Sequence, residues 1–243
     1  MLIIKSSVFK NHSELIFGFS TKKGGKINEP YFFNMSVSVG DDENKVKRNR
    51  DLFFKALGLE TENVAIQNQI HNVGITIVQN GGVYQNNDAL ITNKIGIGLA
   101  VSSADCTTIF IFDKQNKIIA GVHSGWRGTS KKILSFTLKK LKQTFNTKPE
   151  NIIAFIGPSI SLKNYGVSSE VAEQFDEKYL HQSGDKFLLD VSAVNYDILL
   201  NYGVKKENIE RAQLCSFEEQ YLLHSYRRDG KISGRALGVI AMK

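Results

Sequence analysis

Apolar and β-branched residues occur along the chain in short runs separated by polar turns, a pattern that predicts β-strands. In chain order, the predicted strands cover residues 14–21, 63–71, 74–80, 96–103, 107–113, 118–124, 152–159 and 235–242. The segment KQNK between the runs 107–113 and 118–124 has the composition of a hairpin turn.

Longer segments with apolar residues on one face predict helices over 128–145, 168–180 and 192–203. Thr129 and Ser130 are candidate caps for the start of the first helix, and Gly203 ends the last. Strands outnumber helices, and the two do not alternate regularly. We therefore expect an α+β fold: one layered α/β domain over residues 1–243 with mixed, largely antiparallel sheets.

The composition is that of a folded, non-membrane protein. Of the 243 residues 42% are hydrophobic, and the three prolines are isolated, so they mark no domain boundary. No apolar run approaches the roughly 20 residues that cross a bilayer. The start, MLIIKSSVFK, has no cationic region or cleavage-like site typical of a signal peptide. We expect a cytoplasmic monomer.

The net charge of +7 raises the question of a nucleic-acid partner. The lysines are scattered, however, and those between residues 131 and 142 lie on the polar face of a predicted helix. We therefore expect no nucleic-acid partner, whereas the same charge favours a small molecule that carries phosphate.

The predicted hairpin has a chemical consequence. If strands 107–113 and 118–124 pair antiparallel, Cys106 and His123 lie at the same end of the hairpin although they are 17 positions apart in sequence. A neighbouring cysteine and histidine suit either a thiolate nucleophile activated by imidazole or a zinc site. His71, at the end of another predicted strand, would supply a third metal ligand and leave a fourth position open. Taken singly, Cys106 and His71 also suit plain structural roles.

The segment HSGWRG, which follows the second strand of the hairpin, points to anion binding. Gly125 and Gly128 allow a sharp turn beside His123, and backbone N–H groups at the start of a helix can face an anion. Arg127 adds a forked cation suited to phosphate or carboxylate. Trp126 is expected to pack beneath the turn.

Taken together, these segments resemble a known family. Its names include multicopper polyphenol oxidase or laccase-domain proteins, peptidoglycan editing factor, and purine nucleoside phosphorylase/adenosine deaminase. The matching segments are GDDENKVKRNRDLFFKALGL, NQIH, SSADCTTIFIFD, AGVHSGWRG, FIGPSI and SYRRDG. One departure is that the Cys-Cys-Tyr run common in the family after GPSI is replaced by SLKNYGV, which argues against a disulfide or copper role there.

The resemblance implies a zinc site made of His71, Cys106 and His123. It also implies phosphorolysis of adenosine, inosine, guanosine and methylthioadenosine, together with deamination of adenosine. The substrates would be a purine nucleoside and phosphate. Three further residues match polar positions expected around substrate or phosphate: Asn34, Arg50 and Arg228.

In deamination, water activated at zinc would attack C6 of adenine, and a carboxylate would carry the proton. Asp105 is the nearest candidate in the sequence and joins Cys106 and His123 in the predicted catalytic set. In phosphorolysis, Arg50, Arg127 or Arg228 would hold phosphate for attack on the ribose.

Three alternatives stay open. Cys106 with His123 would also suit a metal-free amidase that acts on peptidoglycan precursors. A copper-dependent polyphenol oxidase would need several coppers and more histidines than the five in this chain. The third alternative is a non-catalytic protein with a structural zinc, although such sites are usually closed by four protein ligands.

Overall fold

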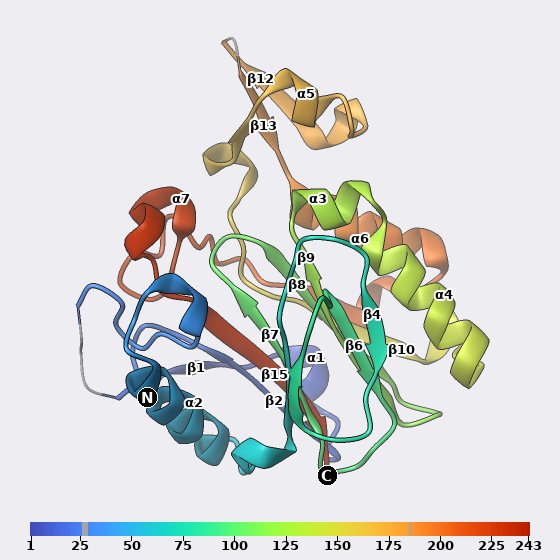
Figure 1. The fold of residues 1–243 in the computed structure, drawn as a ribbon. Coiled ribbons are helices and arrows are strands. Elements are labelled where there is room, and N and C mark those ends of the chain that lie inside the picture. The colour runs from blue at the N-terminus through green and yellow to red at the C-terminus, as the bar shows by residue number, and fades with distance from the viewer. Residues whose placement is uncertain (26–28, 185) are drawn as a thin grey trace.

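Two six-stranded β-sheets pack face to face, and helices cover their outer faces (Figure 1). The computed structural model describes residues 1–25, 29–184 and 186–243. In the first sheet the order is β1 (Ile3–Ile4), β2 (Leu15–Ser20), β15 (Ala236–Met242), β7 (Gly98–Ser103), β3 (Val64–Gln67) and β5 (Gly82–Tyr84). Strand β3 runs parallel to both of its neighbours, and the other pairs are antiparallel.

The second sheet carries the predicted hairpin at its centre. Its order is β14 (Ile209–Arg211), β10 (Ile152–Ile156), β8 (Thr107–Asp113), β9 (Ile118–Ser124), β6 (Ala89–Thr92) and β4 (Ile75–Ile77). The outer pairs β10–β14 and β4–β6 are parallel, and the inner pairs are antiparallel. The expected α+β fold with mixed, largely antiparallel sheets is confirmed.

The helices are few and mostly short. They are α1 (Ser7–Lys10), α2 (Glu43–Ala56), α3 (Trp126–Ser130), α4 (Ile133–Phe145), α5 (Ser169–Ala172), α6 (Val191–Tyr202) and α7 (Tyr226–Asp229). Helix α2 packs on the first sheet, whereas α4 and α6 pack on the second. Asp42 and Asp190 cap the starts of α2 and α6 by accepting backbone N–H groups, and Gly203 ends α6 with a left-handed φ of 101°.

The strand period of two divides the apolar side chains between the layers. In β8, Phe110 and Phe112 face the first sheet, whereas Ile109 and Ile111 face α4 and α6. Between the sheets, the ring of Phe17 meets Phe110 edge to face with centroids 5.1 Å apart. The sheets therefore form the central layers of a four-layer arrangement.

A small third sheet projects from the second one at the top of Figure 1. It contains β11 (Gly166–Val167), β13 (Lys186–Leu189) and β12 (Leu180–Ser183) in that order, and we call residues 165–189, without 185, the tongue. The tongue has an apolar cluster of its own, which includes Leu189 and packs against Trp126 of α3. This contact places the tongue beside the HSGWRG segment.

The structure corrects three predicted elements. The helix expected over 168–180 is reduced to α5 and a 3-10 turn at 177–179, because its apolar residues pack into the small cluster of the tongue. The helix expected over 128–145 breaks at Lys132, which has a left-handed φ of 66°. The strand expected over 63–71 ends at Gln67, and the chain then turns.

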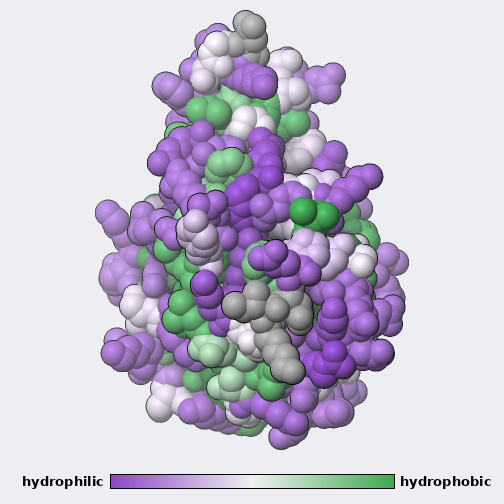
Figure 2. Space-filling view, turned by 90° about the vertical axis from the view of Figure 1, so that its left-hand side faces the viewer, coloured by the Kyte–Doolittle hydropathy of each residue, from purple (hydrophilic) through white to green (hydrophobic). Residues whose placement is uncertain are grey.

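The surface facing the viewer in Figure 2 is mostly hydrophilic, with hydrophobic residues in separate areas. Scattered apolar residues of this kind are normal on folded proteins. Within the described parts of the chain, no helix is both long and apolar enough to span a membrane.

The close contact of the two sheets gives a first prediction. A methyl group at Gly238 of β15 would overlap the ring of Phe110 and lie 2.8 Å from Phe19. We expect Gly238→Ala to lower the free energy of unfolding by about 1–3 kcal/mol through overpacking. In a Phe110→Leu background, where the new methyl has more room, the loss should be smaller. Urea denaturation of the four proteins of this double-mutant cycle measures the coupling, and strictly additive losses would contradict the packing argument.

Candidate metal centre

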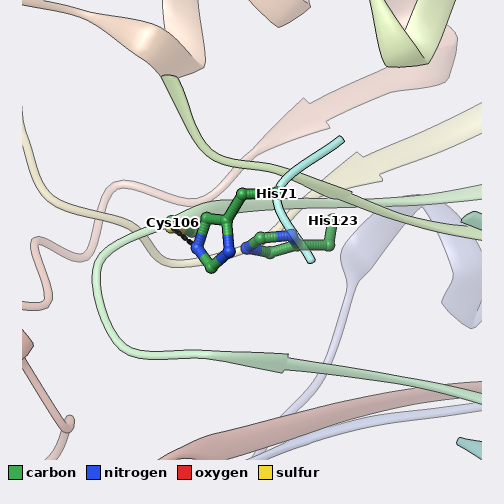
Figure 3. Close-up of side chains that lie close together, drawn as sticks. All are labelled: His71, Cys106 and His123. Carbon is green, nitrogen blue, oxygen red and sulfur yellow. Dashed lines mark hydrogen bonds between the residues drawn. The ribbon is translucent and has the colours of Figure 1, made fainter. Parts of the chain in front are cut away.

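Two histidines and one cysteine meet at one end of the sheet pair (Figure 3). One donor atom each from His71, Cys106 and His123 can be chosen so that all three lie within 4.8 Å of one another. The sulfur of Cys106 is 3.9 Å from Nε2 of His71, and the two imidazole rings stand edge to face with centroids 4.7 Å apart. The predicted trio is therefore brought together, in an arrangement that could hold a metal ion.

The β8–β9 hairpin explains why Cys106 meets His123. Thr108 pairs with His123 and Thr107 with Ser124, so Cys106 lies at the end of the hairpin where β9 finishes. The residue that follows β9 has to be small: a side chain on Gly125 would approach the sulfur of Cys106 to 2.8 Å. Position 125 therefore has to be glycine so that the backbone can lie close to the sulfur. The sequence had suggested only that this glycine allows a sharp turn.

His71 reaches the centre from the turn that follows β3. Its φ is 57°, a left-handed conformation that is uncommon for residues other than glycine. The side chain of His71 is exposed, whereas His123 is only 2% exposed. The centre is thus open on the His71 side and closed behind His123.

A buried carboxylate that sequence reasoning missed lies behind His123. Asp88 is 0% exposed, and its carboxylate is 2.8 Å from Nδ1 of His123. It immediately precedes β6, and the surrounding residues QNNDAL form no recognisable metal motif. Asp88 reaches the centre because β6, which follows it, pairs with β9, which carries His123, and not because of a local sequence pattern.

The centre favours a thiolate beside a charged imidazole when no metal is bound. Burial alone would raise the pKa of Cys106, but the charges and hydrogen bonds of His123 and His71 outweigh it and lower the pKa to about 6. For His123, burial alone would lower the pKa, but the Cys106 thiolate and the Asp88 carboxylate together raise it. The sulfur is therefore already in the deprotonated form that metals bind, whereas His123 would release its Nε2 proton when an ion binds.

Asp105 adjoins the centre, but both of its carboxylate oxygens have partners. One accepts the hydroxyl of Ser216 at 2.6 Å, and the other accepts the backbone N–H of Arg227 at 2.7 Å. The backbone of Asp105 has a left-handed φ of 94°. These bonds tie the Cys106 loop to the segment around α7.

Of the three residues taken from the family resemblance, Arg228 and Asn34 have their side-chain polar groups engaged within the protein, and Arg50 has one N–H engaged. The guanidinium of Arg228 donates to the carbonyls of Ser216, Phe217 and Leu223 and to Asp229. Arg50 donates its Nε–H to the carbonyl of Met35 at 2.7 Å. Fully buried Asn34 donates to Ser36 and Asp41 and accepts from the backbone of Ser36 and Arg235.

Two arginines near Tyr165 make fewer hydrogen bonds within the protein than Arg228 does. Arg127 is exposed and stacks on Trp126, with its Cζ 4.2 Å from the ring centroid, a contact that was not predicted from the sequence. Arg227 is exposed too, stacks on Tyr165 at 4.9 Å and donates to the carbonyl of Gly166. Burial, and then the negative charge of Cys106, raise the pKa of the Tyr165 phenol, while Arg227 and Arg127 oppose the shift. Tyr165 is therefore a neutral hydrogen-bond donor flanked by positive charge.

A third cation, Arg235, lies near enough to Cys106 and Asp105 for their charges to act on it. Burial lowers the pKa of Arg235, and the charges of Cys106 and Asp105 counteract the shift. Its backbone N–H is held by Asn34. Neither Arg227 nor Arg235 was predicted from the sequence to be a site residue. Arg227 is next to Arg228, and the sequence does not distinguish the two; Arg235 follows seven positions after Arg228.

The enclosed space beside the centre is small. Asp105, Cys106, Trp126 and Tyr165 help to line a cavity of about 20 Å³, enough for a water molecule. Larger cavities of about 620 Å³ and 490 Å³ lie at α1 and between α4 and α6, and no member of the trio lines either. The space enclosed beside the centre is therefore too small for a molecule of nucleoside size.

Comparison with known proteins identifies the family of this chain. Residues 16–243 match the family model described as "Multi-copper polyphenol oxidoreductase laccase", and the chain belongs to that family. The expected membership is confirmed.

Curated relatives and solved structures match almost end to end. A protein named purine nucleoside phosphorylase from Bacteroides thetaiotaomicron is 31% identical, with 96% of this chain and 93% of the relative covered. Purine nucleoside phosphorylase YfiH of Shigella flexneri is 34% identical, with 91% of each chain covered. The crystal structure of YlmD from Geobacillus stearothermophilus has a TM-score of 0.92 at 27% identity, with 98% of this chain and 94% of that chain covered.

The lowered pKa of Cys106 predicts its reactivity without metal. In the metal-free protein, the rate of alkylation of Cys106 by iodoacetamide should rise with pH through an inflection near 6, well below the value of about 8.5 for a free cysteine. Mass spectrometry of the labelled peptide measures the rate, and Cys215, which is 6% exposed, is the unreactive internal control. An inflection near 8.5 would show that the imidazoles do not stabilise the thiolate.

Proposed function

We propose that the chain is a zinc-dependent purine nucleoside phosphorylase that splits adenosine, inosine, guanosine and methylthioadenosine and also deaminates adenosine. The observation that carries the proposal is a cluster of two histidines and one cysteine, open on one side and bordered by arginines. The names of the relatives support a purine nucleoside and phosphate as substrates.

The donor set suits zinc. Thiolate and imidazole are preferred zinc ligands, and neighbouring donors of a tetrahedral zinc lie ~3.5 Å apart, close to the 3.9 Å between Cys106 and His71. The family description names copper. A multicopper oxidase needs several copper ions, whereas the described residues contain one group of His, Cys, Asp or Glu side chains placed to hold a metal. Bound zinc would supply Lewis-acid chemistry, with His71, Cys106 and His123 as its protein ligands.

The rim residues would bind and orient phosphate. Arg127 and Arg227 are exposed and lie near Tyr165, and each guanidinium retains N–H groups able to bind phosphate oxygens. The neutral phenol of Tyr165 would donate a further hydrogen bond. Placed here, phosphate would attack the anomeric carbon of the ribose as the purine leaves.

In the deamination of adenosine, Asp105 would carry the proton. Its side chain lines the small cavity together with Cys106, and each carboxylate oxygen can accept a second hydrogen bond besides those from Ser216 and Arg227. The bonds already made would orient it.

A second candidate function rests on a specific contact. Without metal, Cys106, His123 and Asp88 form a thiol–imidazole–carboxylate series of the kind used by cysteine hydrolases. An amidase acting on peptidoglycan precursors would use Cys106 as nucleophile and His123 as its base. Substitution of Cys106 would inactivate both enzymes, so metal dependence has to distinguish them.

Product analysis tests the proposed function. Zinc-loaded protein incubated with adenosine should release adenine only when phosphate is present. Deamination should give inosine without phosphate, and inosine together with hypoxanthine when phosphate allows the inosine to be split. Chelation should abolish both reactions and zinc should restore them. Chromatography resolves the products. No turnover by protein with confirmed zinc would refute the nucleoside proposal, and chelator-resistant hydrolysis of a muropeptide would favour the amidase.

Substitutions of individual arginines should distinguish a role in phosphate binding from a role in stability. We expect Arg127→Ala and Arg227→Ala each to raise the KM for phosphate about tenfold, because each removes a charge-assisted hydrogen bond worth ~1.4 kcal/mol. Arg48→Ala, at an exposed position on α2, is the matched control and should leave this KM unchanged.

Arg228→Lys, by contrast, should lower the melting temperature and leave the KM for phosphate unchanged, because the Arg228 guanidinium binds carbonyls of the protein itself. Steady-state kinetics at varied phosphate and thermal unfolding make the comparison. A tenfold rise in KM for Arg228→Lys alone would reverse the assignment.

A further inference from the structure

The buried carboxylate of Asp88 contacts both histidines of the centre. Its Oδ1 lies 2.8 Å from Nδ1 of His123. A histidine that binds a metal through one ring nitrogen usually donates the N–H of the other to a carboxylate or carbonyl. Bonded in this way, His123 presents Nε2 to the side of the ring where Cys106 lies.

The same carboxylate holds the turn that carries His71. Oδ1 also accepts the backbone N–H of His71 at 3.0 Å. Oδ2 accepts those of Ile70 at 3.3 Å and Asn72 at 2.8 Å. Three consecutive N–H groups thus converge on one side chain, and the middle one belongs to the residue with left-handed φ. The carboxylate therefore accepts backbone N–H groups that a neighbouring strand would accept in a sheet.

The main chain of Asp88 fixes the position of its carboxylate. Its carbonyl accepts the N–H of His123 at 2.7 Å, and its own N–H donates to the carbonyl of Gly74 at 3.0 Å. Asp88 is therefore bonded through backbone and side chain to β9, which carries His123, and to the segment that carries His71.

We propose that Asp88 is the positioning residue of the metal centre, where one shared carboxylate holds the His71 turn and the His123 ring in the geometry of metal ligands. The inference rests on the proposed zinc site. Asp88 itself touches neither the metal nor the substrate in this assignment. Its role is to arrange two ligands that come from distant parts of the sequence before the ion arrives.

Asp88→Asn is a sharp test because it keeps the shape and removes acceptor capacity. If the amide NH₂ replaces Oδ1, it faces the N–H of His71 and the ring of His123. If it replaces Oδ2, it faces the N–H groups of Ile70 and Asn72. Either orientation opposes donor to donor.

Asp113→Asn is the matched control. Asp113 is also 0% exposed and also accepts backbone N–H groups, those of Gln115 and Asn116 at 3.0 Å each. It lies at the opposite end of the same β8–β9 hairpin. The control therefore removes a comparable buried carboxylate without touching the centre.

Two measurements are made on the full-length wild-type protein and on both variants. Competition with a chromophoric chelator gives zinc affinity, which should fall about 10- to 100-fold in Asp88→Asn and stay within about twofold in Asp113→Asn. Amide hydrogen exchange in the metal-free proteins should show His71 protected at least about 100-fold in the wild type and in Asp113→Asn, and released in Asp88→Asn. In Asp113→Asn the remaining side-chain oxygen can still accept the N–H groups of Gln115 and Asn116, so both amides should stay protected.

The outcomes separate this inference from the zinc proposal. Unchanged zinc affinity in Asp88→Asn, or an equal loss in Asp113→Asn, overturns the positioning role. A His71 amide that exchanges freely in the wild type also overturns it, and this result needs no folded variant. If the wild type binds no zinc, the proposed metal fails. His71 protection that depends on Asp88 would then still support the positioning role.

Discussion

The antiparallel pairing of β8 with β9 fixes both the positions of the apolar core residues and the position of Cys106 relative to His123. Each strand sends one set of side chains between the two sheets and the other set against α4 and α6, so the pair cannot slip by one residue without turning apolar side chains out of both layers. The same register fixes Cys106 beside the end of β9. The geometry of the centre is therefore set by the packing of the molecule as a whole, and Gly125 adds the close approach that the sulfur requires.

Charge alternates outward from the interior. The carboxylate of Asp88 lies deepest, the imidazole of His123 covers it, the sulfur of Cys106 follows, and arginines stand around the rim. Each charge thus has a neighbour of opposite sign, which compensates for burial. The adjacent residues Arg227 and Arg228 have different roles. Arg227 has N–H donors at the surface beside the tongue, whereas the Arg228 guanidinium donates to carbonyls of the protein.

Local patterns were sufficient for the hairpin, the fold class and the proximity of Cys106 to His123, because these depend on neighbouring strands. They were insufficient wherever tertiary contacts decide the outcome. Val171, Phe175 and Tyr179 have helical spacing but pack into the cluster of the tongue without forming a continuous helix. Asp88 carries no signal because its partners come from a distant turn and from β9. The two arginines of SYRRDG cannot be told apart by type or by spacing, since only the folded α7 sends their side chains to different places.

The three sulfur and nitrogen donors differ in their access to solvent, from exposed His71 through half-buried Cys106 to His123 at 2% exposed. An ion held at the proposed site would therefore enter and leave past His71. Opening of the His71 turn would then limit how quickly an ion is exchanged. Because His71 is also a proposed ligand and Asp88 holds its backbone, a change that loosens this turn would speed the exchange and weaken the affinity together.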